Sequence, residues 1–466
     1  MQDAFASKPR RNEAARPADE ITDHLGTGWR GWIKAWRIRA AARGYKRFAR
    51  NPLLSEVVGA ALLVRYVIPT GTATSRLSYV LVAARRLTTR PLRAMARRLL
   101  QPWLTPERLD LVRREHVGWT YYTEGFGGLS SHGLSSTLVL KAPRPNGEKG
   151  VLYSSFEYNW MRLVANYDAR RVLEDYFLVG ASSWSPPDYA AFANLSALSP
   201  DPVFVGISNP VDIEHYRLFA PHVRAVPLLA SDWIKPDHFA PKPHDEREID
   251  ILMVANWLRF KRHWLLFEAL ARMDRRLRVV LIGRNGEGRT ERDIRDEIRA
   301  FGVRQDVELI TDVSIDTVFE HQCNAKVAAV FSRREGSCVA VAECLFADTP
   351  VAVMRDAHIG SKAYINPTTG CITARRRIAR DLCRLLERPE SIAPRQWAIE
   401  HITCDRSSAI LNEQLRGYSL GAGLPWTIDI TPLQWHSSPH YADAEDDERM
   451  KSAVDQLRNE YGVPLI

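Results

Sequence analysis

Between residues 245 and 400, short apolar runs alternate with helical segments, and this alternation limits the possible folds more than any other feature of the sequence. Strands are expected at IDILMVAN (249–256), LRVVLIG (277–283), VELIT (307–311), AKVAAVFS (325–332) and PVAVM (350–354). Helical patterns such as 261–273 and 291–301 separate them. Strands that alternate with helices predict an α/β domain built on a parallel, doubly wound sheet.

The length of the chain predicts more than one domain. Its 466 residues exceed a single ordinary core, so two domains with extensions are expected. The segment 232–248, with three prolines and mixed charge, predicts a linker between them. We divide the chain into a disordered tail (1–29), a basic helical extension (30–114), a reduced N-terminal Rossmann-like domain (115–240), a C-terminal Rossmann-like domain (241–400) and a C-terminal helical tail (401–466).

The positive charge is concentrated in the first hundred residues. The formal net charge is +9, and between Arg30 and Arg98 the only acidic residue is Glu56. The segment 31–50 intersperses tryptophans with cations, as in a basic amphipathic helix. The next segment, 53–69, is apolar but short and charged near its middle, so we do not assign it as transmembrane. Two interpretations stay open: docking on an anionic membrane surface, or packing on the protein's own core.

Cysteine usage and the N-terminal residues favour a cytoplasmic protein. None of the six cysteines forms a CxxC pair, and several lie in apolar patterns, so reduced thiols are expected rather than disulfides or a metal site. The first two dozen residues lack the apolar core of a signal peptide. If the extension docks on a membrane, the protein would be peripheral on its inner face.

Two carboxylates bracket a short apolar helix in SRREGSCVAVAECLFADTPVAV (332–353). Glu335 and Gly336 follow a strand, at the edge of an open α/β sheet where ligands bind. Ser337 is the expected N-cap of the helix, whose free N–H groups suit an anion such as a phosphate. Glu343 lies two turns further on, where a carboxylate can accept both hydroxyls of a ribose. The spacing alone favours a surface helix that carries two unrelated glutamates, because such pairs are common by chance.

The order of these residues resembles the signature of the retaining glycosyltransferases of family four, the group 1 type, which have two Rossmann-like domains (the GT-B fold). The signature appears here as SRREGSCVAVAE and CLFADTPVAV, with Asp348 where the family usually has glycine. Upstream, VANWLRFKRHWLLFEAL (254–270) resembles the family's basic segment, and Lys261 falls on the lysine that contacts the donor diphosphate. Asn256 stands where the family has arginine, so Arg259 or Arg284 could supply the missing cation.

The resemblance implies transfer of a sugar from a nucleotide diphosphate sugar to an acceptor of glycolipid or polysaccharide type, with retention. The C-terminal domain would bind the donor and the N-terminal domain the acceptor, whose usual glycine-rich loop is matched only weakly by EGFGGLSSHGLSS (124–136). No cofactor and no metal are implied. The catalytic residues would be Glu335, Lys261 and Arg259. The donor-binding residues would be Asn256, Arg284, Gly336, Ser337, Cys338, Val339 and Glu343.

Within this assignment, Glu335 would contact the transferred sugar, Lys261 would neutralise the leaving diphosphate, and Glu343 would hold the ribose. Three alternatives remain. The first is a non-catalytic protein of the same fold, favoured by Asn256. The second is a nucleotide-sugar epimerase or phosphorylase, whose further catalytic residues we do not locate. The third is a binder of nucleic acid or membrane through the arginine-rich helices. We expect no nucleic-acid partner because no recognised module is present.

Overall fold

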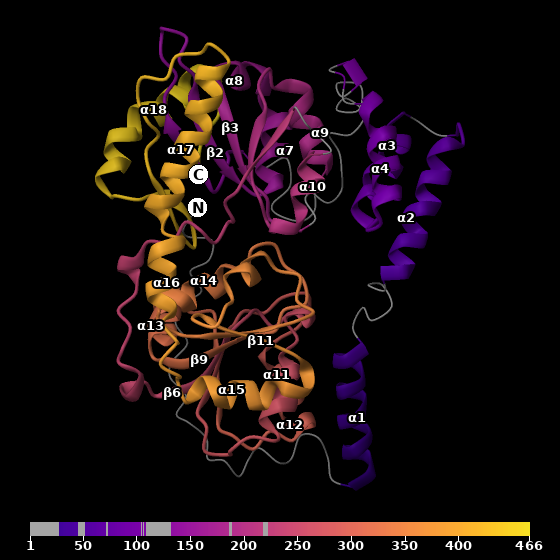
Figure 1. Ribbon diagram of the computed structural model, residues 1–466, viewed down its shortest axis with the longest axis vertical. Helices are drawn as coiled ribbons and strands as arrows, with labels where there is room; N and C mark the ends of the chain where they lie inside the picture. Colours follow the sequence, from indigo (N-terminus) through magenta and orange to yellow (C-terminus); the bar gives the residue numbers. More distant parts are fainter. Residues whose placement is uncertain are drawn as a thin grey trace.

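The computed structural model describes residues 28–44, 52–70, 73–103, 105, 107–108, 132–185, 189–217 and 222–466. Most of the tail expected to be disordered (1–29) and the first part of the glycine-rich stretch (124–136) lie outside these residues. The described chain forms two α/β domains, one above the other in Figure 1, with further helices along one side. The prediction of two Rossmann-like domains is therefore confirmed.

The first domain contains a five-stranded sheet in the order β1-β2-β3-β4-β5. Strand β1 is antiparallel to β2, and the other neighbours are parallel. The strands are β1 (Thr137–Lys141), β2 (Gly150–Ser155), β3 (Tyr176–Ala181), β4 (Val203–Gly206) and β5 (Val223–Val226). The helices are α7 (Glu157–Asn166), α8 (Ala169–Asp175), α9 (Tyr189–Leu198) and the single turn α10 (Ile213–Tyr216). Strands β2 and β3 are buried along their whole length, as expected of strands covered on both faces.

The second domain contains a six-stranded parallel sheet in the order β11-β10-β9-β6-β7-β8. The strands are β6 (Ile249–Val254), β7 (Val279–Gly283), β8 (Val307–Thr311), β9 (Ala325–Val330), β10 (Val351–Met354) and β11 (Gly370–Thr373). The helices are α11 (His263–Leu270), α12 (Glu291–Phe301), α13 (Ile315–Cys323), α14 (Val339–Phe346) and α15 (Ile378–Leu386). The chain builds β6 to β8 in one direction and returns to place β9 beside β6. The β6/β9 pair is thus the switch point at which open α/β sheets bind ligands.

The last segment of the chain returns to the first domain. Helices α16 (Pro394–His401) and α17 (Cys404–Gly421) lead into a hairpin of β12 (Leu433–His436) and β13 (Ser438–Tyr441), and α18 (Glu445–Tyr461) follows. Tyr441 donates a hydrogen bond to the carbonyl of Val139 in β1, and Ile466 N donates to Leu134 O. The segment 401–466, expected to be a helical tail, therefore also contains strands and completes the first domain.

Before the first domain, the residues that the structure describes form the helices α1 (Gly28–Gly44), α2 (Pro52–Val67), α3 (Ala73–Arg86) and α4 (Arg90–Leu100). Helix α1 packs on α12 of the second domain, whereas α2, α3 and α4 pack together and α3 contacts α9. Among the helices of the described residues, none combines the length and apolar character needed to cross a membrane.

Glu56, the only acidic residue between Arg30 and Arg98, has a structural role. Its carboxylate accepts hydrogen bonds from the backbone N–H and the hydroxyl of both Thr88 and Thr89, which precede α4. Partial desolvation opposes ionisation, but these hydrogen bonds outweigh it and lower the pKa of Glu56 to about 2. The residue thus ties α2 to the start of α4.

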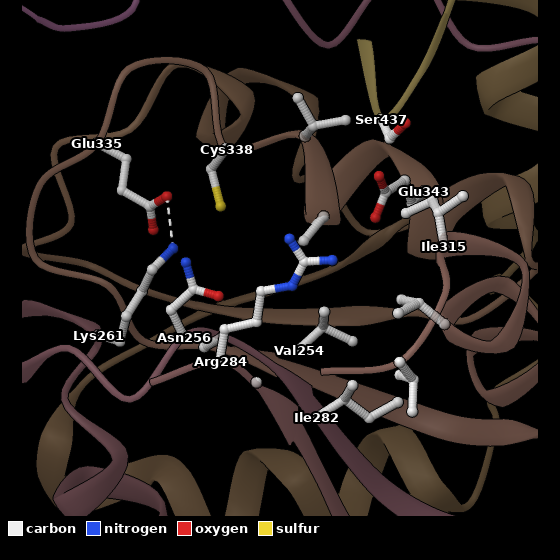
Figure 2. Close-up of a pocket in the computed structure, with 16 residues that line it drawn as sticks. Val254, Asn256, Lys261, Ile282, Arg284, Ile315, Glu335, Cys338, Glu343 and Ser437 are labelled. Carbon is white, nitrogen blue, oxygen red and sulfur yellow. Dashed lines mark hydrogen bonds and ion pairs between the residues drawn. The ribbon is translucent and has the colours of Figure 1, made fainter. Parts of the chain in front are cut away.

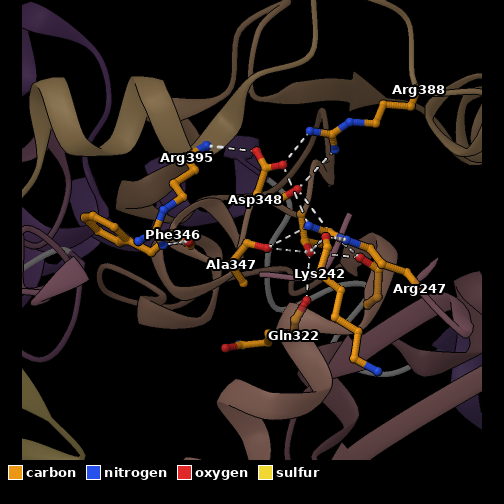
Figure 3. Close-up of polar contacts among 10 residues, drawn as sticks. Lys242, Arg247, Gln322, Phe346, Ala347, Asp348, Arg388 and Arg395 are labelled. Atoms are coloured by element: carbon orange, nitrogen blue, oxygen red, sulfur yellow. Dashed lines mark hydrogen bonds and ion pairs between the residues drawn. The ribbon is translucent and has the colours of Figure 1, made fainter. Parts of the chain in front are cut away.

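Asp348 occupies a turn in the second domain that the family usually builds with glycine. Its φ is 56°, in the left-handed region, which aspartate adopts more readily than most residues. Its carboxylate accepts a hydrogen bond of 2.5 Å from Arg388 Nη2 and lies 3.7 Å from Arg247 Nη2 (Figure 3). Arg247 is buried and also donates to the carbonyls of Ala347 and Ala325. The side chain of Asp348 therefore stabilises a turn that glycine would form through backbone freedom alone.

Replacing Asp348 separates these two contributions. Asp348→Gly and Asp348→Ala remove the same carboxylate, so both should lower the free energy of unfolding. Asp348→Ala should be less stable than Asp348→Gly by about 1 kcal/mol, because only glycine adopts this conformation without strain. Chemical denaturation of the two variants measures the difference. Equal stabilities would show that the left-handed conformation is not maintained.

Candidate active site

A cavity of about 470 Å³ lies at the carboxyl edge of the second sheet, at the switch point between β6 and β9. This volume is within the range of small-molecule sites. Seven of the ten residues predicted for the site line it: Asn256, Lys261, Arg284, Glu335, Cys338, Val339 and Glu343. Gly336, Ser337 and Arg259 do not. The structure thus brings together most of the residues that the motifs suggested.

At one end of the cavity, Lys261 Nζ and Glu335 Oε2 form an ion pair of 2.7 Å (Figure 2). Lys261 comes from the single turn η8 (Arg259–Lys261) after β6, and Glu335 from the loop after β9. Desolvation alone would lower the pKa of Lys261, but the Glu335 carboxylate outweighs it and raises that pKa. Lys261 is therefore a cation. Glu335 Oε1 is buried and makes no hydrogen bond to the described residues, so a ligand hydroxyl could donate to it.

Arg262 fixes the position of Lys261. It has a φ of 58°, in the left-handed region, and it is buried. Its guanidinium donates from Nε to Phe331 O and from Nη2 to Ser332 O, at the end of β9. The third guanidinium nitrogen, Nη1, pairs with Asp356 Oδ2 at 2.7 Å. These bonds join the turn that carries Lys261 to the strand that leads to Glu335.

Glu343 lies at the other end of the cavity, near Ile315 and Ser437 in Figure 2. It is buried, and it accepts a hydrogen bond from Gln322 Nε2 at 3.1 Å. Desolvation raises the pKa of the Glu343 carboxyl. A ligand with two neighbouring hydroxyls could donate to the carboxylate and offset that cost.

Arg284 and the start of α14 lie between these two ends. The Arg284 guanidinium points toward the middle of the cavity, below Cys338 (Figure 2). Helix α14 starts at Val339, and Cys338 is its N-cap, with no side-chain capping hydrogen bond. Val339 and Ala340 line the cavity. An uncapped helix amino terminus beside a cation is a favourable place for an anionic group.

Three of the predicted residues, Arg259, Gly336 and Ser337, do not line the cavity. Arg259 is exposed and outside the cavity, so of the two arginines suggested to replace the missing cation, only Arg284 reaches it. Gly336 contacts the first domain: a Cβ there would lie 2.3 Å from Ser183 O. Gly360 allows a similar contact, 2.1 Å from Ser208 O. These glycines permit the two domains to approach closely.

The prediction of Ser337 as the N-cap of the helix was wrong. Its hydroxyl instead bonds the hydroxyl of Ser231, in the chain between the domains, and accepts from Ser231 N at 3.2 Å. The Ser231 hydroxyl also bonds the Tyr364 hydroxyl at 2.7 Å, and Tyr364 donates to Asp232. All four residues are buried. Ser337 therefore anchors the loop before α14 to the interdomain connection.

Two features of the site were not predicted from the sequence: the presence of Ser437 and the protonation state of the Cys338 thiol. Ser437 is the turn residue of the β12–β13 hairpin and reaches the cavity from the C-terminal segment; only the HSSPH turn pattern could have pointed to it. Next to it, His436 Nε2 lies 3.0 Å from Asp316 Oδ1 on α13. Desolvation, and next the charge of Glu335, raise the pKa of the Cys338 thiol. Cys338 is thus a neutral thiol.

The remaining polar groups do not form a metal centre. Within the residues that the structure describes, no cluster of three or more histidine, cysteine or acidic side chains is arranged to hold a metal ion. All six cysteines are free, and three of them, Cys323, Cys344 and Cys404, are buried.

Comparison with known proteins agrees with the geometry of the second domain. Residues 234–397 match the sequence model of the family described as glycosyl transferases group 1. The chain therefore carries a group 1 glycosyltransferase domain, and the resemblance seen in its motifs is confirmed over this segment. A comparison with curated proteins found no match.

Several solved structures are similar at low identity. Sucrose-phosphate synthase from Thermosynechococcus elongatus has 16% identity and a TM-score of 0.44, over 59% of this chain and 74% of that protein. HepE from Anabaena, solved in complex with UDP, has 14% identity and a TM-score of 0.45, over 58% and 78%. The lipopolysaccharide outer core galactosyltransferase WaaB has 15% identity and a TM-score of 0.43, over 57% and 75%.

The buried hydrogen-bonded group formed by Ser231, Asp232, Ser337 and Tyr364 predicts that the stability of the protein depends on pH. Desolvation raises the pKa of Asp232 to about 6, despite hydrogen bonds from Tyr364 and Leu229 N. The unfolded chain ionises near the ordinary value of 3.8, so between these two pH values the folded protein binds more protons than the unfolded one. The contribution of Asp232 to the free energy of unfolding is then complete below about pH 4, and it is lost as the pH rises through about 6.

Comparison with Asp232→Asn isolates this effect. The free energy of unfolding of the wild type, minus that of the variant, should fall by about 2–3 kcal/mol from pH 4 to pH 7 and stay flat above it. Denaturant titrations at several pH values measure this difference. A difference that is constant or rises with pH would mean that the folded carboxyl titrates normally.

Proposed function

We propose that this protein transfers a sugar from a nucleotide diphosphate sugar to an acceptor of glycolipid or polysaccharide type, with retention at the anomeric carbon. The observation that carries the proposal is the order of groups in one cavity. A carboxylate suited to a ribose stands at one end and an ion pair at the other, with an arginine and an uncapped helix terminus between. Nucleoside, diphosphate and sugar are joined in that same order.

In this arrangement each group has a chemical task. Glu343 accepts hydrogen bonds from the ribose hydroxyls, and Ile315 and Ser437 border the nucleoside. Arg284 and the first turn of α14 contact the diphosphate. Glu335 accepts a hydrogen bond from a hydroxyl of the sugar through Oε1, the oxygen that does not pair with Lys261. Lys261 turns toward the diphosphate oxygens.

The reaction breaks the bond between the anomeric carbon and the diphosphate oxygen and forms a bond from that carbon to the acceptor oxygen. Nucleoside diphosphate leaves, and the acceptor's proton passes to it or to solvent. Negative charge grows on the diphosphate, where Lys261, Arg284 and the helix terminus stabilise the transition state more than the ground state. Because the chain supplies these positive groups itself, we propose that the reaction needs neither a metal nor a cofactor.

The acceptor would bind between the domains. The loop after β3 meets the loop that carries Glu335: Arg334 Nε donates to Ser185 O at 2.7 Å, and Ser183 O lies against Gly336. An acceptor held by the first domain would therefore reach the sugar end of the cavity. We place the enzyme in the cytoplasm, since buried free thiols suit a reducing compartment.

Nucleotide binding tests the proposal directly. Glu343→Gln should weaken the binding of a nucleoside diphosphate by about ten- to a hundredfold, the value of a hydrogen bond to a charged group. Titration calorimetry with a panel of nucleoside diphosphates measures it. Glu320→Gln, which changes an exposed carboxylate of α13, is the matched control and should bind as the wild type does. If no nucleoside diphosphate binds the wild type, the alternative of a non-catalytic protein gains support.

The turn η8 offers a second test, because of its two cations Lys261 lines the cavity and Arg259 does not. Lys261→Ala should lower kcat by about a hundredfold or more, the usual effect of losing one transition-state contact. Arg259→Ala, two residues earlier and outside the cavity, should have nearly normal kcat. Adding Arg284→Ala to Lys261→Ala should reduce kcat further. Assays of sugar transfer, with NMR of the product's anomeric configuration, decide both the roles and the retention. Normal turnover of Lys261→Ala would exclude it from the reaction.

A further inference from the structure

Helices α1 and α2 each expose an apolar face to solvent. On α1, Trp29, Trp32 and Trp36 follow a helical spacing, and even the least exposed of them, Trp36, is 54% exposed. On α2, the exposed apolar side chains cover one side of the helix from end to end: Leu53, Leu54, Val57, Val64 and Val67, with Ile68 just beyond it. Folded proteins rarely leave contiguous apolar surface of this kind uncovered unless it binds something.

The orientation of α1 is fixed by contacts with the second domain. Arg39 Nη1 donates to Ala300 O at 2.8 Å, and Arg43 Nη2 pairs with Glu268 at 2.7 Å. The Arg43 guanidinium also lies over the ring of Phe301, 5.3 Å from its centre. These contacts hold the helix against α11 and α12 of the second domain. Arg39 and Arg43 follow Trp32 and Trp36 by seven residues each, so they lie on the same side of α1, two turns further on. The exposed tryptophans therefore lie beside this contact, toward the amino end of the helix, and another rotation of α1 would break these bonds.

Helix α2 is anchored in the same manner. Ser55 donates to Arg86 O, and Glu56 binds Thr88 and Thr89. Gly59 allows close contact with Leu87, since a Cβ there would lie 2.8 Å from a methyl group of that side chain. The face that carries these residues packs on α3, and the apolar face lies opposite. In Figure 1, α1 lies beside the second domain and α2 to α4 beside the first, all on one side of the molecule.

The helices that carry the exposed apolar side chains, and the neighbouring α4, also carry exposed positive charge. Exposed cations are Lys34 and Arg37 on α1, Arg65 on α2, and Arg90, Arg97 and Arg98 on α4. Glu56 is the only acidic residue from 28 to 103, and its carboxylate is engaged. Tryptophan and aliphatic side chains on one face, with arginine and lysine at its border, are what a helix needs to lie in the interface of an anionic bilayer.

We propose that α1 and α2 together form a docking surface for an anionic lipid bilayer. The exposed apolar side chains would enter the boundary between headgroups and acyl chains, and the exposed cations of these helices would meet lipid phosphates. A second copy of the chain would bring two positively charged surfaces together, and a nucleic acid would leave the apolar side chains exposed. Neither alternative satisfies both parts of the surface. The inference goes beyond the proposed glycosyl transfer and does not depend on the donor cavity.

Flotation of the full-length protein with lipid vesicles tests the proposal. Binding is expected to vesicles of phosphatidylcholine with phosphatidylglycerol, to be much weaker with phosphatidylcholine alone, and to fall as salt rises. The double variant Trp32→Ser with Trp36→Ser should bind these vesicles more weakly by about tenfold or more, because two indoles no longer leave water on binding. Val57→Ser with Val64→Ser should weaken binding in the same direction.

The matched control is Ile399→Ser with Leu420→Ser, which removes two exposed apolar side chains from α16 and α17. It should bind vesicles as the wild type does. Unchanged thermal unfolding and an unchanged oligomeric state in the tryptophan variant would show that only docking is lost. The proposal is overturned if the wild type fails to bind anionic vesicles at low salt, or if the tryptophan variant binds as well as the control. Self-association that the tryptophan variant abolishes, or tighter binding to DNA than to vesicles, would overturn it in favour of the other partners.

Discussion

The ion pair between Lys261 and Glu335 joins the ends of the two central strands of the second sheet, and the rest of the site is built around it. Each partner is held by its own set of bonds: Arg262 ties the lysine's turn to the end of β9, and the loop of the glutamate is bonded to His358 O through Glu335 N. A charged pair with little access to water is costly unless its geometry is precise. Buried charged pairs of this kind are common at functional sites, where the charges take part in binding or in the reaction.

The parts of this molecule that could be predicted from sequence are those encoded by nearby residues. The period of the apolar runs from residue 249 onward was sufficient for the parallel sheet, because a buried strand and its following helix both leave a local pattern. Glu335 and Glu343 were predicted because one follows a strand end and the other lies in the helix after it, whereas Lys261 was assigned from the resemblance of its segment to the family. The carboxyl ends of parallel strands meet at one edge, so local position translates into proximity.

What could not be predicted depends on contacts between distant segments. Ser337 has the residue type and position of an N-cap, but its hydroxyl is used by Ser231, more than a hundred residues away in sequence. Arg259 and Arg284 are equally good candidates by composition, and only the direction of each side chain separates them. The two interpretations of the basic extension were framed as alternatives. The structure shows that α1 packs on the protein with one face while it exposes the other, so packing does not exclude docking.

The return of the chain to its first domain has a mechanical consequence. The two passages between the domains lie next to each other: Ile234 forms a parallel bridge with Thr403, Cys404 N donates to Ile234 O, and Ser407 donates to Asp232 O. Two adjacent and hydrogen-bonded crossings behave as the pin of a hinge. Such a pair of crossings would favour rotation of the domains around one axis over twisting or sliding. Opening would then separate Gly336 from Ser183 while the network at Ser231 stays near the axis. Residues after 430, although last in the chain, would move with the first domain and carry Ser437 away from the cavity in the same swing.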